Sequence, residues 1–165
     1  MAKILAAVLI ISDRVFNGEM QDLSSPVIQE YLHECEWEVS SINIVNDDIE
    51  QIESTLRKLI SSDPANLILT AGGTGFGLRD NTPEATERVI EKKVPGFPEL
   101  IRFKGSLHNP NAVLSRAVCG ISDGKLILNL PGKPSAAIEN LEAISETLPH
   151  ALEMLPIIAG HPKRK

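Results

Sequence analysis

Four short polar or glycine-rich segments each come directly after a stretch that is expected to be a strand. They are Ser12–Arg14, Asn46–Asp48, Gly72–Asp80 and Leu130–Pro134. In an open α/β sheet, ligands bind beyond the carboxyl ends of the strands, which meet at one edge. The segments supply glycines, carboxylates and a few cations, which together suit phosphate groups and Mg²⁺. We therefore expect them to form one site for an anionic ligand.

The glycine-rich segment from Gly72 to Gly77 departs from both common phosphate-binding fingerprints. Leu78 stands where GxGxxG needs its third glycine, and no Lys-Ser/Thr pair follows as in a P-loop. Its glycines still allow positive φ and let backbone amides point at one oxyanion. The alternative is a tight turn that only packs, and the residues alone leave that alternative open.

Two aspartates, Asp47 and Asp80, follow neighbouring strands. Each has an ordinary structural interpretation, because Asp80 can be a turn residue and Asp47 competes with Asp48 for a helix cap. As a pair they can hold Mg²⁺, which prefers oxygen ligands and keeps one or two carboxylates plus substrate phosphates. Magnesium would reconcile the net charge of −6 with an anionic substrate.

Other polar residues at this edge have more than one interpretation. Ser12 is not expected to be a nucleophile, because no histidine lies in a matching motif. Asp13 can form a solvated pair with Arg14. Asn129 and the turn Pro131–Pro134 can contact a ligand through amides, with the Lys133 ammonium reaching a phosphate, or they can only start the next helix. The four histidines have no metal-binding spacing and are expected to be structural or on the surface.

Alternating apolar and amphipathic segments must position these residues, and they predict an α/β fold. Continuous apolar runs or alternation predict strands over 4–11, 37–45, 67–69 and 125–130. Helical spacing predicts helices over 22–34, from 47 or 48 to Pro64, over 82–93, over 97–105 and after Pro134. Thr82 is expected to cap the third of these helices. Pro149 should bend or break the last one. Residues 113–121 are expected to be a short helix and then a strand. The expected architecture is three layers, with helices on both faces of a mostly parallel sheet.

Length and composition describe one globular domain. The 165 residues are 42% hydrophobic, which excludes wholesale disorder, and no linker divides them, so we expect a core over about 4–155 and a basic tail over 156–165. An acidic chain is a poor candidate for nucleic-acid binding, and no apolar run has the length of a membrane span. Cys35 and Cys119 make no disulfide framework, so we expect both to be reduced and the protein to be cytoplasmic.

The motifs, in their order, resemble the signature of the molybdenum-cofactor biosynthesis family, which includes bacterial molybdopterin adenylyltransferases and domains of gephyrin. The stretch from Leu67 to Thr86 reads LILTAGGTGFGLRDNTPEAT. The other segments that carry the resemblance are Ile11–Arg14, Gly18 with Gln21-Asp22, Asn46–Asp48, Gly105-Ser106, Leu114–Arg116 and Asn129–Gly132. The resemblance covers roughly residues 4–155.

The resemblance implies a molybdopterin-binding α/β domain, usually a homotrimer. It implies Mg²⁺-dependent transfer of AMP from ATP to the terminal phosphate of molybdopterin, with pyrophosphate released and the product passed to a molybdate-insertion enzyme. The family's two essential aspartates fall on Asp47 and Asp80, which are also the expected Mg²⁺ ligands. The expected substrate-binding residues are Ser12, Asp13, Gly72, Gly73, Thr74, Gly75, Arg79, Ser106, Ser115, Asn129, Pro131, Gly132 and Lys133.

Three other functions compete with the transferase. A non-catalytic carrier would bind molybdopterin and hand it on, but it would not need two carboxylates that face a phosphorylated ligand. A nucleotide hydrolase on the same scaffold would consume ATP without any pterin. A scaffold protein like gephyrin is disfavoured, because the chain has no second domain or linker.

Overall fold

The computed structural model describes residues 3–155, so the expected basic tail over 156–165 lies outside the described residues. One sheet of six strands has the order β2-β1-β3-β6-β5-β4. The strands are β1 (Leu5–Ile11), β2 (Glu38–Val45), β3 (Leu67–Ala71), β4 (Lys92–Lys93), β5 (Cys119–Ser122) and β6 (Lys125–Leu130). Strands β2, β1, β3 and β6 are parallel, whereas β5 and β4 run antiparallel to their neighbours. The predicted α/β fold is confirmed, with a mixed sheet.

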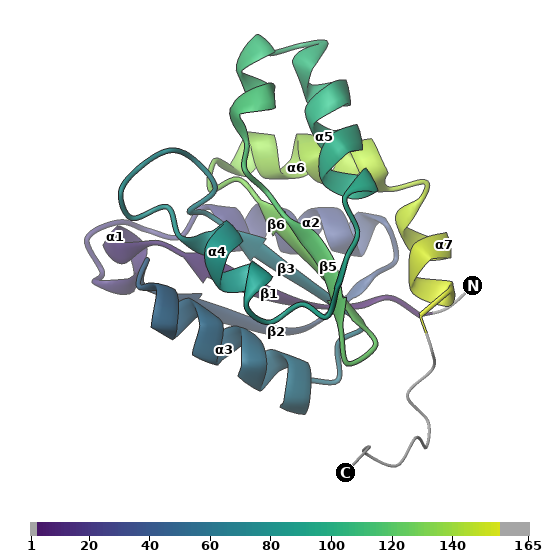
Figure 1. Cartoon of the computed structure of the whole chain (residues 1–165), viewed down its shortest axis with the longest axis horizontal. Coiled ribbons are helices and arrows are strands. Elements are labelled where there is room, and N and C mark those ends of the chain that lie inside the picture. The colour runs from purple at the N-terminus through teal and green to yellow at the C-terminus, as the bar shows by residue number, and fades with distance from the viewer. Residues whose placement is uncertain (1–2, 156–165) are drawn as a thin grey trace.

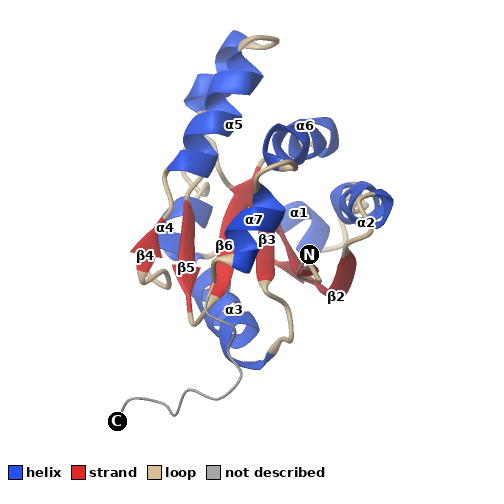
Figure 2. Cartoon of the chain, turned by 90° about the vertical axis from the view of Figure 1, so that its right-hand side faces the viewer, coloured by secondary structure: helices blue, strands red, loops and turns tan. Residues whose placement is uncertain are grey.

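Helices cover both faces of this sheet (Figures 1 and 2). They are α1 (Asp13–Phe16), α2 (Ser24–Glu34), α3 (Ile49–Ser62), α4 (Thr82–Glu87), α5 (Gly96–Ser106), the 3-10 helix η1 (Pro110–Leu114), α6 (Pro134–Ile144) and α7 (Leu148–Glu153). Residues of α2, α5, α6 and α7 pack in one hydrophobic core, and residues of α3 and α4 pack in the other. The expected three layers are therefore present. Within residues 3–155, no helix has the length and apolar character needed to cross a bilayer.

The central strand β1 shows why its sequence is a continuous apolar run. Val8 and Ile10 face the core under α2 and α6, and Leu9 and Ile11 face the core under α3. Their exposed fractions are 3% or less. A strand that is buried on both faces cannot alternate apolar with polar residues. The same run ends where the chain reaches the carboxyl edge of the sheet.

Helix α4 differs from its prediction at both ends. Thr82 does not cap it, because the Thr82 hydroxyl donates instead to the Gly72 carbonyl oxygen at 2.8 Å. The helix ends at Glu87 rather than near Lys93, since the next backbone groups pair with β5. The Glu91 and Val94 amides donate to β5 carbonyl oxygens, each at 2.8 Å. This pairing makes residues 92–93 an edge strand, whereas the spacing of apolar residues had predicted that the helix continues there.

Pro149 breaks the predicted long helix into α6 and α7, as one of the two expected outcomes. Residues 113–121 divide between the end of η1 and β5, which also agrees with the expectation. The short helix α1, which follows β1 directly, was not predicted. Its four residues are too few for helical periodicity to show.

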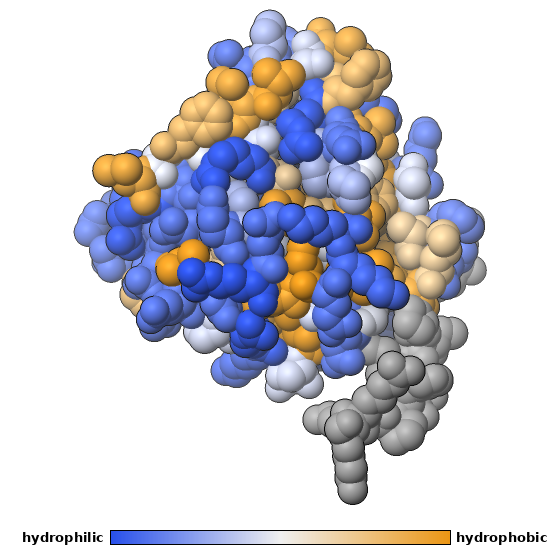
Figure 3. Space-filling model, viewed as in Figure 1, coloured by the Kyte–Doolittle hydropathy of each residue, from blue (hydrophilic) through white to orange (hydrophobic). Residues whose placement is uncertain are grey.

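Large apolar side chains are exposed on the projecting α5–η1 end and on the loop between β3 and α4 (Figure 3). They are Phe76, Leu78, Phe103, Leu107, Val113 and Leu114. Leu78 is fully exposed, at 101%. Exposed apolar groups that gather in this way mark surfaces that contact another molecule.

Candidate active site at the carboxyl edge of the sheet

The four segments expected to form one site do meet at the carboxyl ends of β2, β1, β3 and β6, which are neighbours in the sheet. The Ser12 amide donates to the Val45 carbonyl oxygen at 3.0 Å, and the Gly72 amide donates to the Leu130 carbonyl oxygen at 3.1 Å. These bonds continue the pairing past the strand ends. They hold the segments against one another in register.

A pocket of about 390 Å³ opens among these segments. Five of its lining residues were expected in the site: Ser12, Asp47, Gly72, Gly73 and Gly132. Others come from the loop that follows α1 and from the start of α2, and they include Met20, Gln21, Asp22, Leu23 and Ser24. Only Gln21-Asp22 had a sequence signal, through the resemblance. The apolar members gave none, because an exposed methionine or leucine in a loop has no spacing to recognise.

Asp13, Asp47 and Arg79 form a network across two strand ends. The Asp13 amide donates to Asp47 Oδ2 at 2.7 Å, and the Asp47 amide donates to Asp13 Oδ1 at 3.0 Å. Arg79 donates from Nε and Nη2 to the two oxygens of Asp13, at 2.5 and 2.8 Å. Asp13 therefore pairs with Arg79 and not with Arg14. The hydrogen bond from Arg79 lowers the pKa of Asp13 below its ordinary value.

The pKa of Asp47 moves the other way. Burial is the main cause of the increase, and the negative charges of Asp13 and Asp80 add to it. Asp48, rather than Asp47, caps α3, because its Oδ1 accepts hydrogen bonds from the Glu50 and Gln51 amides at 3.1 Å. The structure thereby settles which aspartate starts the helix. It leaves the Asp47 carboxylate in the pocket.

Asp80 is enclosed by its own loop. Its Oδ2 accepts a hydrogen bond from the Gly77 amide at 2.7 Å. A Cβ atom on Gly75 or Gly77 would lie 2.9 or 2.8 Å from this oxygen, which is closer than real Cβ contacts allow. With the Asp80 carboxylate in this position, the loop leaves no room for a side chain at either glycine.

Position 72 must be a glycine for a different reason. Its φ is +117°, and a Cβ there would lie 2.1 Å from the Ile11 carbonyl oxygen. A Cβ on Gly132 would lie 3.2 Å from Gly72 Cα. Backbone therefore approaches backbone where β1, β3 and β6 end, and this close approach shapes the floor of the pocket.

Arg116 is the main polar residue at the site that was not among the expected ligands. Its Nε donates to the Gly75 carbonyl oxygen at 2.7 Å, its Nη2 donates to the Asp80 carbonyl oxygen at 2.6 Å, and its Nη1 pairs with Glu84. Its backbone amide also donates to the Thr74 carbonyl oxygen at 3.1 Å. The only sequence signal was its place in the motif Leu114–Arg116.

The structure places two expected ligands, Ser106 and Ser115, away from the pocket. The Ser106 hydroxyl donates to the Phe103 carbonyl oxygen within α5, and Ser115 ends η1, where its Oγ accepts from the Ala117 amide at 3.3 Å. Pro131 and Lys133 lie on the turn before α6, and within residues 3–155 the Lys133 ammonium has no ion-pair partner. The turn is thus free to meet a ligand, whereas the two serines lie on the α5–η1 end.

Asn129 has a structural environment rather than the ligand contact expected of it. It is fully buried, and its Nδ2 donates to Thr70 Oγ1 at 3.0 Å and to Thr86 Oγ1 at 2.9 Å. Its Oδ1 accepts from the Val118 amide at 3.0 Å. Every polar group of the side chain is therefore engaged by protein. It links β6 to β3 and α4 directly beneath the site.

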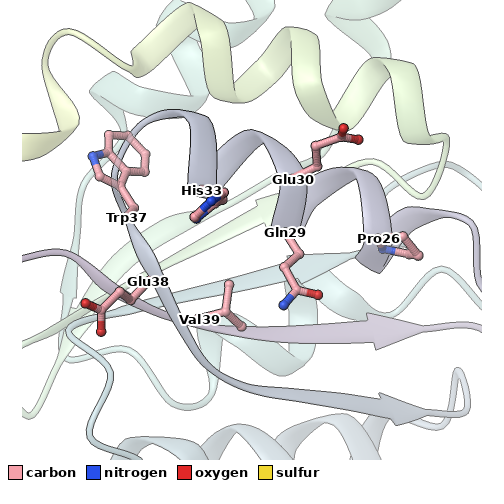
Figure 4. A pocket seen from close by; sticks show the side chains of 7 residues that line it. All are labelled: Pro26, Gln29, Glu30, His33, Trp37, Glu38 and Val39. Carbon is pink, nitrogen blue, oxygen red and sulfur yellow. The ribbon is translucent and has the colours of Figure 1, made fainter.

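A second pocket, of about 530 Å³, lies between α2 and the start of β2 (Figure 4). Its lining includes Trp37, His33, Glu30 and Glu38, and no expected site residue. Glu38 pairs with Lys3 at 2.8 Å. The pocket is at the amino end of β2, away from the carboxyl edge, and its carboxylates would repel a polyanion. It is larger than the first pocket but does not suit phosphate chemistry.

The donor set at the carboxyl edge fits Mg²⁺ bound jointly with a substrate. Within residues 3–155, no hydrogen bond reaches Oδ1 of Asp47 or Oδ1 of Asp80, so each carboxylate keeps one free oxygen. Burial is the main cause of the raised pKa of Asp47, and the nearby charges of Asp13 and Asp80 add to it; a cation at this place would offset the charge contribution. The described residues contain no cluster of three or more His, Cys, Asp or Glu that could hold a metal by itself. Mg²⁺ is commonly held by one or two carboxylates together with phosphates.

Comparisons with known proteins agree with this geometry. The family described as "Probable molybdopterin binding domain" matches residues 7–150. The molybdopterin adenylyltransferase of Helicobacter pylori strain 26695 is 42% identical over 157 residues, which are 94% of this chain and 89% of that protein. The molybdenum cofactor synthesis protein cinnamon of Drosophila melanogaster is 40% identical over 156 residues, 94% of this chain but 26% of the fly protein.

The fold has solved counterparts as well. The crystal structure of the molybdopterin biosynthesis enzyme MoaB from Thermus thermophilus superposes with a TM-score of 0.87 at 43% identity. The match covers 92% of this chain and 95% of that one. The chain therefore belongs to the molybdopterin-binding domain family of molybdenum-cofactor biosynthesis proteins.

Proposed function

We infer that this protein is a molybdopterin adenylyltransferase. It joins the AMP part of ATP to the terminal phosphate of molybdopterin and releases pyrophosphate. The observation that carries this inference is the similarity, over nearly the whole chain, to proteins named for that activity. The geometry of the carboxyl edge supports it, because glycines, carboxylates and the turn that carries Lys133 lie together there, which suits a phosphorylated ligand.

No side-chain nucleophile is needed for this reaction. A phosphate oxygen of molybdopterin attacks the α-phosphorus of ATP, and the bond from that phosphorus to the pyrophosphate oxygen breaks. The protein must hold two polyanions in line and offset the charge that develops on the leaving group. Mg²⁺ bound to Asp47 and Asp80 would neutralise phosphate charge. Asp13 takes no part as a ligand in this scheme, because Arg79 already occupies both of its oxygens.

The turn before α6 is the best place for a phosphate group. In the described chain no side chain caps α6, so its first backbone amides remain available to an anion. Lys133 stands at that helix start, and its ammonium has no ion-pair partner among residues 3–155. By contrast, Asp22 already occupies the start of α2, where its Oδ1 accepts from the Ser24 and Ser25 amides at 2.9 and 3.0 Å. We therefore assign phosphate binding to α6 rather than to α2.

We also propose that the protein works as a homotrimer and passes its product to a molybdate-insertion enzyme. The exposed apolar side chains on the α5–η1 end and on the β3–α4 loop support an assembly or docking surface there. Sedimentation equilibrium tests the trimer, which should have three times the 17.9 kDa mass of one chain. A monomer at micromolar concentration would contradict it.

A single-turnover assay tests the transferase. Molybdopterin and Mg-ATP are mixed with excess enzyme, and adenylyl-molybdopterin and pyrophosphate are followed together. We expect both products to form in equal amounts, and only when the pterin is present. Tight pterin binding without product would favour a carrier, and loss of ATP without pterin would favour a hydrolase.

A further inference from the structure

We propose that Arg116 is a positioning residue for adenylyl transfer, which fixes the Asp80 carboxylate by clamping the β3–α4 loop without touching a substrate. This inference rests on the proposed function, since Asp80 matters only if the site transfers a nucleotide. It is carried by the bonds between Arg116 and that loop. The clamp consists of Arg116 with Thr74, Gly75, Asp80 and Glu84.

The contacts of the clamp extend along the whole loop. The backbone of Arg116 bonds to the Thr74 carbonyl oxygen, and its guanidinium bonds to the carbonyl oxygens of Gly75 and Asp80. The third nitrogen pairs with Glu84 in the first turn of α4. One side chain therefore joins the start of the loop, its end and the helix that follows. A planar guanidinium can satisfy three acceptors in fixed directions, which an ammonium cannot do.

These contacts determine where the Asp80 carboxylate lies. Arg116 holds the backbone carbonyl of Asp80, while the Gly77 amide holds its Oδ2. The loop must curve tightly for the second bond, because Gly75 and Gly77 lie almost against that oxygen. Without the guanidinium, the carbonyl oxygens of Gly75 and Asp80 lose their shared donor. The loop can then open and carry the carboxylate out of position.

Arg116 is poorly placed to bind substrate phosphate itself. Each of its three guanidinium nitrogens already bonds to protein, and Glu84 offsets its charge. Its side chain is 33% exposed, against 58% for Arg79. It also does not line the pocket that contains Asp47. Its effect on the reaction therefore passes through the loop.

The test combines kinetics with amide hydrogen exchange on the full chain, using Arg116→Ala and Arg116→Lys. We expect kcat to fall about 100-fold in Arg116→Ala, the loss that a displaced reacting group causes, with KM for molybdopterin and ATP within threefold. The Gly77 amide should exchange at least tenfold faster, while β1 amides keep wild-type rates. Added guanidinium at millimolar concentration should restore part of kcat. Arg116→Lys keeps the positive charge but loses the planar guanidinium with its fixed donor directions, and it should show the same changes to a smaller degree.

Arg57→Ala is the matched control. Arg57 also bonds to one carboxylate, that of Glu53, and to one backbone carbonyl, that of Arg88, but at the carboxyl end of α4 and not at its start. The Arg57→Ala variant should leave kcat and the exchange rate of the Gly77 amide unchanged. A kcat within threefold of wild type in Arg116→Ala overturns the proposal, as does a loss of kcat with unchanged Gly77 exchange or a rise of KM alone.

The two proposals fail in distinguishable ways. If the wild type transfers no AMP, the proposed function fails, and with it the catalytic meaning of the clamp. The exchange measurement would then still show whether Arg116 holds the loop. If the wild type is active and Arg116→Ala is equally active, only the clamp fails.

Discussion

Asp13 and Asp47 each donate a backbone amide to the other's carboxylate, at 2.7 and 3.0 Å. This reciprocal pair fastens the end of β1 to the end of β2, and it brings two negative charges together. Arg79 offsets one of them by pairing with Asp13. Among residues 3–155, no cation pairs with Asp47, and the first prediction follows from this imbalance.

Replacing Asp47 with asparagine should abolish turnover and yet stabilise the fold at neutral pH. The new side-chain amide would keep an acceptor for the Asp13 amide but would carry no charge to neutralise phosphate. We expect kcat to fall at least about 100-fold, the order of loss when an electrostatic contact to the transition state is removed. Molybdopterin binding, measured by calorimetry, should survive. Near-full adenylylation would contradict the role assigned to Asp47.

The gain in stability should depend on pH. Because the pKa of Asp47 is raised, the folded wild type binds more protons than the unfolded chain between the ordinary value of 3.8 and the raised value. The contribution of Asp47 to wild-type stability therefore falls as pH rises through that window, and this contribution is absent in Asp47→Asn. Above the window the variant should melt at a higher temperature than the wild type. Asp48→Asn, which keeps a good helix cap, should melt like the wild type at every pH.

Lys133→Ala should weaken ATP binding without slowing the chemical step. Its ammonium is exposed and unpaired among the described residues, so its loss removes one charge-assisted contact, worth about 1.4 kcal/mol or tenfold in affinity. We expect KM for ATP to rise about tenfold with kcat within twofold. Steady-state kinetics at two salt concentrations would check this, with Lys58→Ala on α3 as the control. An unchanged KM would remove Lys133 from the site.

Gly72→Ala should be much more destabilising than Gly18→Ala, although both glycines have positive φ. Gly18 has open space around its missing Cβ, so only the backbone conformation is strained, at about 1–2 kcal/mol. At Gly72 the new Cβ would also collide with the Ile11 carbonyl. We expect a loss of about 3 kcal/mol or more. Urea unfolding of both variants measures the difference, and equal losses would show that the sheet edge can relax.

Asn129→Ala should lower stability by about 2–4 kcal/mol, because it removes three hydrogen bonds and leaves the Val118 amide and the buried Thr70 hydroxyl without a partner, while the Thr86 hydroxyl keeps its bond to the Thr82 carbonyl oxygen. Pterin affinity of the folded fraction should change little, since the amide faces protein. Urea unfolding and calorimetry check the two parts. A large loss of affinity with unchanged stability would instead restore the ligand contact that the sequence suggested.

The sequence was most informative where one physical effect acts alone. Continuous apolar runs located β1, β3 and β6, because burial on both faces excludes polar residues. Strand ends located the site, because parallel strands finish together. It was least informative where distant backbone groups compete for a side chain. Thr82 looks like a cap until the Gly72 carbonyl is known to lie 2.8 Å away. Arg116 looks like any surface arginine until the loop is folded against it.

Asn129 is a second case in which contacts from distant segments could not be predicted from the sequence. A polar residue at a strand end is a reasonable ligand, and nothing local reveals that Thr70, Thr86 and Val118 surround it. The choice between Asp47 and Asp48 was similar, since either can start α3. Only the hydrogen bonds of Asp48 to the first turn decide it. Hydrogen-bond partners from distant parts of the chain were therefore the main feature that could not be predicted from the sequence.

The direction of β1 has a consequence for how this domain can be joined to others. Its first residue, Leu5, is at the amino edge of the sheet, and α7, the last described helix, lies beside the same end of the molecule (Figure 1). The substrates would enter at the opposite edge. A second domain fused at either side would therefore leave the entrance open, and two such domains on one chain could work at the same time.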